Sequence, residues 1–75
     1  MNSDAFPPDL LEAQTAWYTT YGQLAATAAH GSAVHRRRLL RLSRQIAAHP
    51  YWETPEGTPA ARVALKELAR VKARP

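Results

Sequence analysis

The sequence of 75 residues contains no cysteine, so neither a disulfide framework nor a thiolate metal site is available to it. Its apolar runs fall far short of the roughly 20 residues that span a bilayer. The first residues show neither the basic region nor the apolar region of a signal peptide. These absences predict a soluble, cytoplasmic protein without a membrane partner.

Catalytic signatures are also lacking. The sequence has only three glycines and no glycine-rich phosphate loop, no nucleophile elbow and no carboxylate pair. The spacings of His30, His35 and His49 fit no common metal site. We therefore expect a protein that is not an enzyme and that uses no cofactor, no metal and no small-molecule substrate.

Charge is spread unevenly along the chain. Residues 1–34 carry three acidic residues and neither Lys nor Arg, whereas residues 35–52 carry five arginines and no carboxylate. The formal net charge is +4. An acidic front and a basic middle can pair within one chain, pair between two copies, or leave a basic face for an acidic partner.

Helical patterns account for nearly all of the chain, and no strand-like alternation occurs. Pro8 and Pro59 suit first helical positions, Thr58 suits an N-cap, and Pro50 stops a helix. The sequence predicts an all-α fold, an antiparallel helical hairpin plus a third packed helix in a three-helix bundle. The expected organisation is a flexible tail at 1–6 and a single domain at 7–75, with helices at about 8–29, 33–48 and 59–73 and an aromatic loop at 49–58.

Apolar residues at helical spacing give each segment one stripe that can be buried. In the first segment the stripe repeats every seven residues from Leu10, a spacing that can hold the second helix or join two copies. The bulky Trp17, Tyr21 and Trp52 are expected to meet between the helices. The predicted core consists of Leu10, Trp17, Tyr21, Leu24, Leu39, Leu42, Ile46, Trp52, Leu65 and Leu68.

The segment HPYWETPEGTP, residues 49–59, follows the second helix and is expected to lack regular structure. Its Tyr51 and Trp52 have two interpretations. They can close the end of a small core, because each aromatic side chain buries about 150–250 Å². Alternatively, they can form an exposed stacking platform beside His49 and Arg44, as in proteins that grip single-stranded nucleic acids.

The arginine-rich segment HRRRLLRLSR is the feature most suited to a function. Its candidate binding residues, on the face opposite the apolar one, are Arg37, Arg38, Arg41 and Arg44. The first hypothesis is a protein-interaction or accessory module whose partner is another protein or a second copy of itself. The alternative is a nucleic-acid-associated accessory protein in which these guanidinium groups contact phosphates.

The segments FPPDLLEAQ and HPYWETPEGTPAARVALKELAR, together with the arginine-rich middle, resemble a group of short proteins from actinobacteria, streptomycetes in particular. The resemblance covers most of the chain. It implies a bacterial, cytoplasmic setting and no assigned activity, and it transfers no site residues.

Overall fold

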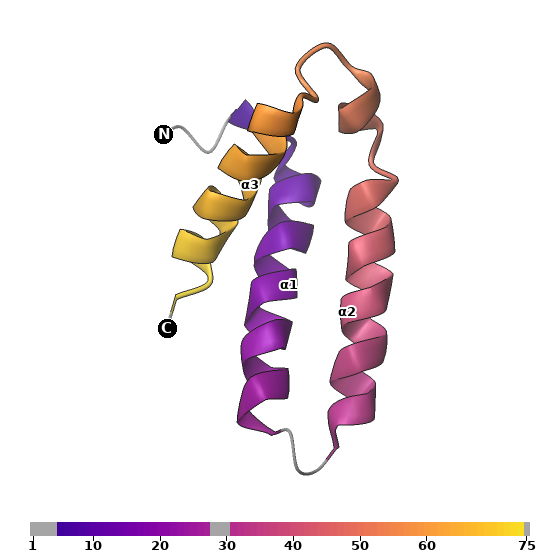
Figure 1. Cartoon of the computed structure of the whole chain (residues 1–75), viewed down its shortest axis with the longest axis vertical. Helices are drawn as coiled ribbons and strands as arrows, with labels where there is room; N and C mark the ends of the chain where they lie inside the picture. Colours follow the sequence, from indigo (N-terminus) through magenta and orange to yellow (C-terminus); the bar gives the residue numbers. More distant parts are fainter. Residues whose placement is uncertain (1–4, 28–30, 75) are drawn as a thin grey trace.

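The computed structural model describes residues 5–27 and 31–74, which are almost entirely helical (Figure 1). The elements are α1 (Pro8–Ala26), α2 (Ser32–Ala47), the short 3₁₀ helix η2 (Pro50–Glu53) and α3 (Pro59–Lys72). No strand occurs within these two ranges. The predicted all-α fold, a hairpin plus a third helix, is confirmed. The parts of the predicted tail and first helix at residues 1–4 and 28–29 lie outside the described residues.

Proline and threonine determine where two of the helices begin. Pro8 and Pro59 occupy the first positions of α1 and α3. Proline lacks a backbone N–H, but the N–H at this position has no hydrogen-bond partner within a helix, so none is lost. The Oγ1 of Thr58 accepts a hydrogen bond from the backbone N–H of Ala61 at 3.1 Å, which caps α3. Local chemistry thus explains both helix starts.

Helix α1 lies between the other two helices. Figure 1 shows α2 antiparallel to α1 along its length, and α3 running in the same direction as α1 beside its upper half. Both α2 and α3 pack on α1, but they hardly touch each other. The result is an elongated molecule of 42 × 24 × 18 Å whose lower half is only two helices wide.

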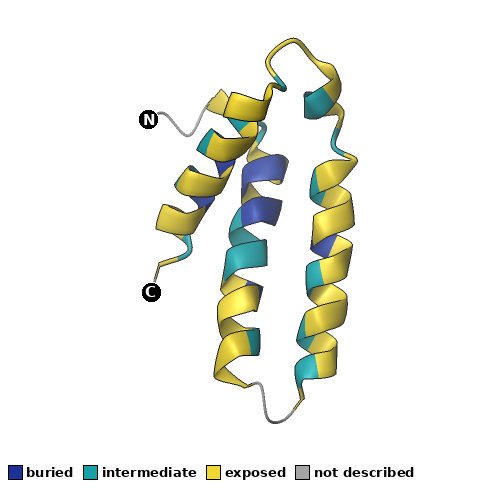
Figure 2. Cartoon of the chain, viewed as in Figure 1, coloured by how far each residue is buried: buried dark blue, intermediate teal, exposed yellow. Residues whose placement is uncertain are grey.

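The main buried cluster joins the start of α1 to α3, and it contains Phe6, Leu10, Leu11, Leu65 and Ala69. Leu10 and Ala69 are completely buried, and Figure 2 shows the buried positions gathered on the upper part of α1 and the facing side of α3. The predicted tail is wrong at Phe6, which is only 6% exposed. Its ring packs edge-on against Tyr51, which explains its burial.

The predicted core is only partly buried. Among its ten residues, Leu10, Leu42 and Leu65 are buried, and six others are half-buried. The prediction is wrong for Tyr21, which is 54% exposed, because α3 does not cover the lower half of α1. The expected meeting of Trp17, Tyr21 and Trp52 does not occur: Trp17 stacks on Tyr21 on α1, whereas Trp52 pairs with Tyr51 at the end of α2.

The aromatic segment after α2 is more regular than the sequence predicts, because Pro50–Glu53 forms the 3₁₀ helix η2. The Nε1 of Trp52 donates a hydrogen bond to the carbonyl of Ile46 at 2.6 Å. The Arg62 guanidinium lies over the Trp52 ring, 4.3 Å from its centroid. These contacts fold the loop onto the core instead of presenting Trp52 as a free stacking platform.

The same loop makes Gly57 a sensitive position. A Cβ atom at Gly57 would lie 2.5 Å from the carbonyl oxygen of Tyr51 and 2.6 Å from the Cα of Trp52. We expect Gly57→Ala to lower the free energy of unfolding by about 2 kcal/mol, because rigid backbone atoms must move. Urea denaturation followed by circular dichroism measures this change.

Gly22→Ala is the matched control. Gly22 lies inside α1, and its added methyl group would meet nothing within 4 Å. This substitution is expected to stabilise the protein by up to about 1 kcal/mol through helix propensity. Equal effects of the two substitutions would contradict the close packing of the loop.

Candidate binding groove

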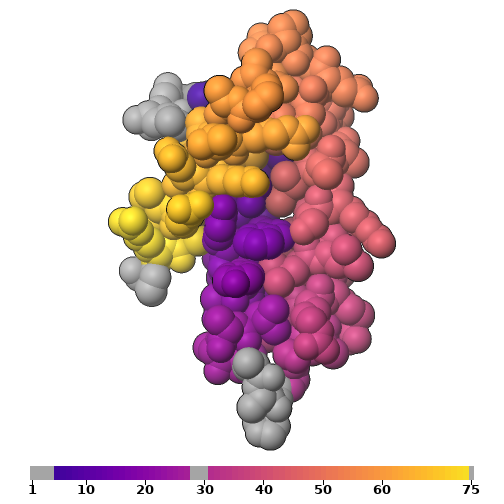
Figure 3. Space-filling view, viewed as in Figure 1, coloured from indigo at the N-terminus to yellow at the C-terminus, as the bar shows by residue number. Residues whose placement is uncertain are grey.

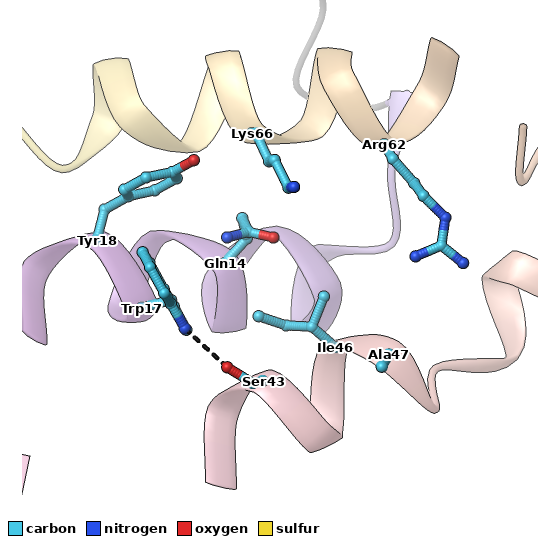
Figure 4. Close-up of a pocket in the computed structure, with 8 residues that line it drawn as sticks. All are labelled: Gln14, Trp17, Tyr18, Ser43, Ile46, Ala47, Arg62 and Lys66. Carbon is cyan, nitrogen blue, oxygen red and sulfur yellow. Dashed lines mark hydrogen bonds between the residues drawn. The ribbon is translucent and has the colours of Figure 1, made fainter. Parts of the chain in front are cut away.

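An open groove lies between α2 and α3, with α1 as its floor. Its cavity volume is about 290 Å³. Figure 3 shows α1 reaching the surface below α3 and beside α2, and Figure 4 shows side chains from all three helices around the groove. The lining residues are Gln14, Trp17, Tyr18, Ser43, Ile46, Ala47, Arg62 and Lys66.

Aromatic side chains form the floor. The Nε1 of Trp17 donates a hydrogen bond to the Oγ of Ser43 at 2.9 Å, so the indole lies toward α2 (Figure 4). One turn further along α1, the ring of Tyr21 stacks on Trp17 with centroids 5.4 Å apart and planes inclined by 8°. Tyr18 meets Trp17 edge-on at 5.3 Å on the side of α3. The floor therefore continues into the uncovered lower half of the hairpin.

The wall formed by α3 is cationic. Arg62, Lys66 and Arg70 are each four residues apart, so they share one side of the helix, and all three are exposed. Arg62 and Lys66 line the groove, and the guanidinium of Arg70 lies 5.5 Å from the ring centroid of Tyr18. We call these three residues the cationic rail.

The wall formed by α2 is uncharged where it lines the groove. Ser43, Ile46 and Ala47 form it. Leu40 is seven residues before Ala47 and therefore lies on the same side of α2, toward the lower end of the hairpin. It is 52% exposed, but Arg36 and Arg44, each four residues from Leu40, lie beside it on this side of α2, so the uncharged wall is confined to the groove itself.

Gln14 is the buried polar residue of the floor. The residue is only 5% exposed, and its side chain makes no hydrogen bond to another described residue. Figure 4 places its amide in the groove, below Lys66. No buried polar atom of the described residues is fully enclosed without a partner, so the amide reaches solvent through the groove.

The four predicted binding arginines do not form one unit. Arg37, Arg41 and Arg44 are exposed on the outer side of α2, one or two turns apart. Arg38 instead donates from its Nε to the Oγ1 of Thr20 at 3.1 Å, so it ties α2 to α1. Among the described residues, no carboxylate lies within salt-bridge distance of any of the four. We call Arg37, Arg41 and Arg44 the arginine stripe.

Sequence analysis missed the cationic rail, because a charged stripe on a helix is usually solvated. A signal was nevertheless present. Arg62, Lys66 and Arg70 flank one edge of the apolar stripe of α3, which contains Leu65. A row of cations beside the buried edge of a helix indicates that the row borders the neighbouring helices.

A hydrogen bond between His49 and Asp9 lies outside the groove. The Nδ1 of His49 accepts a hydrogen bond from the backbone N–H of Tyr51, and its Nε2 lies 3.0 Å from the Oδ2 of Asp9. With Nδ1 accepting, Nε2 carries the proton and donates to the carboxylate. This hydrogen bond lowers the pKa of the Asp9 carboxyl from its ordinary value of 3.8, and desolvation partly opposes the shift.

Two features that could indicate a function do not occur among the described residues. No group of three or more His, Asp or Glu side chains among them is arranged to hold a metal ion. None of their helices has both the length and the apolar character needed to cross a membrane.

Comparison with known families identifies a family model that matches most of the chain. Residues 9–68 match the model of a domain of unknown function, DUF8825. The chain belongs to the DUF8825 family. The DUF8825 match extends from the first turn of α1 into α3, so it contains every residue that lines the groove. No curated protein and no solved structure matches the chain.

The Asp9–His49 contact predicts a pH dependence. Because the folded pKa of Asp9 is lowered, its carboxylate stabilises the fold above its ordinary pKa, and this contribution is lost as the pH falls through the folded value. We expect Asp9→Ala to destabilise the protein at about pH 5 and to have a much smaller effect at about pH 2.5. Urea denaturation at both pH values measures the difference.

Glu12→Ala is the control for this experiment. It removes a carboxylate from the next part of α1 but leaves the bond between Asp9 and His49 intact. A pH dependence of the same size for both variants would show that the general acidity of α1, not this contact, is responsible.

Proposed function

We propose that this DUF8825 protein is a small non-enzymatic binding module that holds a segment of another protein in the groove between α2 and α3. The observation that carries the proposal is the aromatic floor, where Trp17 and Tyr21 stack at the surface between two helices that hardly touch. An alternative arrangement with α3 seated across this floor would bury both rings.

The composition of the groove supports protein recognition. Aromatic side chains and arginine are enriched where proteins bind one another, especially at the residues that contribute most affinity. Here Trp17 and Tyr18 line the groove together with Arg62, and Tyr21 stacks on Trp17. A groove between helices is also a common site for an amphipathic helix, which inserts its apolar face. The volume of about 290 Å³ accommodates several side chains of such a partner.

Another protein is favoured over a second copy of the chain. A second copy would bring the same net charge of +4 toward the cationic rail, and like charges oppose association. The bacterial, cytoplasmic setting implied by the resemblance to actinobacterial proteins is part of this proposal.

The proposal is tested with three designed helical peptides of about 18 residues that share one apolar face and carry acidic, neutral or basic flanks. We expect at least one peptide to bind with micromolar affinity and to shift the amide NMR signals of residues around Trp17, Ile46 and Lys66. Tyr21→Ala should weaken this binding by about tenfold, because an exposed aromatic anchor is lost.

Val34→Ala is the matched control for Tyr21→Ala. Val34 is 61% exposed, but it lies on the same side of α2 as Arg37 and Arg41, away from the groove. Its substitution should leave peptide affinity unchanged. Failure of all three peptides to bind, or NMR shifts confined to surfaces outside the groove, would refute the proposed function.

Nucleic-acid binding by the arginine stripe is the second candidate. It is supported by the alignment of Arg37, Arg41 and Arg44 on one exposed side of α2, with no carboxylate of the described residues near them. A stripe of about 10 Å, from the 1.5 Å rise per residue, can contact neighbouring phosphates. This candidate uses a different surface from the groove, so the two functions are separable by substitution.

Binding to mixed-sequence duplex DNA tests the second candidate. Three phosphate contacts predict that the logarithm of the binding constant falls with the logarithm of salt concentration with a slope of about −3. Substituting Arg37, Arg41 and Arg44 by Gln should abolish the binding, whereas substituting Arg62, Lys66 and Arg70 by Gln removes the same charge elsewhere and should have a smaller effect. No binding at low salt eliminates this candidate.

A further inference from the structure

We infer that the occupant of the groove is an acidic amphipathic helix whose carboxylates are one turn apart and face the cationic rail. This inference rests on the proposed function and adds the chemistry of the partner. Three features of the groove carry it: the charge of one wall, the spacing of that charge, and the apolar character of the rest.

The charge of the rail is not neutralised within the described chain. Arg62, Lys66 and Arg70 have no carboxylate within salt-bridge distance among the described residues. The acidic residue of α3, Glu67, is one position beyond Lys66 and three before Arg70, and it lies within salt-bridge distance of neither. No carboxylate lines the groove. An anionic partner therefore meets three cations with no acidic residue of the groove to repel it.

The spacing of the rail matches a helix. Its three residues are four positions apart, so successive side chains are separated by about 6 Å along α3 and the rail is about 12 Å long. Acidic residues at positions i, i+4 and i+8 of a second helix have the same separation. A partner helix lying along α3 can therefore pair each carboxylate with one cation of the rail.

The remaining surface suits the apolar face of the same helix. Trp17 and Tyr21 form the floor, and Ile46 and Ala47 form the opposite, uncharged wall. In addition, Gln14 is a buried residue whose amide has no partner among the described residues and faces the groove. A polar group of the partner that reaches it would satisfy an amide that otherwise depends on water.

A nucleic-acid strand is the competing anionic occupant, because cations and aromatic rings can also hold phosphates and bases. The groove favours the peptide because only one of its walls is charged. Ile46 and Ala47 line the opposite wall, and they match aliphatic side chains rather than a phosphate backbone. Single-stranded DNA is accordingly included in the experiment as a competitor.

The experiment compares three peptides by isothermal titration calorimetry with the full chain. The first carries Glu at i, i+4 and i+8 beside a leucine stripe, the second replaces each Glu by Gln, and the third keeps the leucine stripe but moves the Glu residues to the far side of the helix. We expect the first to bind about tenfold more tightly than either of the others, from three partly exposed charge pairs. Its advantage should decrease as salt is added.

Two triple variants of the protein locate the effect. Substituting Arg62, Lys66 and Arg70 by Gln should remove the preference for the acidic peptide, because the rail is gone. Substituting Arg37, Arg41 and Arg44 by Gln lowers the net charge by the same amount and should preserve the preference. Because Arg62 and Arg70 also lie over aromatic rings, the single variant Lys66→Glu, which has no such contact, provides an independent measurement if the first variant does not fold.

The outcomes separate this inference from the proposed function. If neutral and acidic peptides bind the groove equally, the acidic partner is refuted and the protein-binding groove stands. If no peptide binds, the proposed function itself fails. Equal losses in the two triple variants would show that net charge, not the rail, selects the partner. Tighter binding of an oligothymidine strand, with displacement of the acidic peptide, would assign the groove to nucleic acid.

Discussion

The packing of Leu10 on α1 with Leu65 and Ala69 on α3 is the contact on which the rest of the architecture depends. These three residues are almost completely buried. The small side chain of Ala69 allows close packing of the two helices, and Phe6 and Leu11 complete the cluster. Because this contact holds α3 on α1, and not on α2, the central helix retains one uncovered side. The groove is therefore a direct product of how the core is built.

A chain of this size has little apolar surface to bury, and most of it is used at one end. The 3₁₀ helix η2 closes that end, where Trp52 hydrogen-bonds to the carbonyl of Ile46 and Tyr51 packs on Phe6. Trp17 and Tyr21 are not needed for this closure, whereas Tyr18 packs against the core cluster. Two aromatic groups thus have separate roles: one completes the fold, and the other remains at the surface where a partner can reach it.

Much of the fold was predictable because its signals are local. Pro8 and the Thr58–Pro59 pair define helix starts through backbone chemistry that needs no tertiary information. The solvent exposure of Tyr21 was not predictable in this way. Helical periodicity assigns a residue to a face, but whether that face is covered depends on the length and position of another helix. The same limit applies to Arg62, Lys66 and Arg70, whose row is evident in the sequence but whose position beside Trp17 and Tyr18 arises only from packing. The direction of Arg38 toward Thr20 is likewise set by the neighbouring helix.

The two-helix lower half of the molecule has an energetic consequence. Beyond Thr20 on α1, and before Leu42 on α2, no described residue is fully buried, and the hydrogen bond between Arg38 and Thr20 is a polar tie at this boundary. Segments with few buried apolar contacts open at lower free energy than the core. The hairpin should therefore separate from its lower end while the upper end stays closed. A ligand lying over Tyr21 and Leu40 would contact both α1 and α2 at this end. Its binding would therefore hold the two helices together along the whole length of the hairpin.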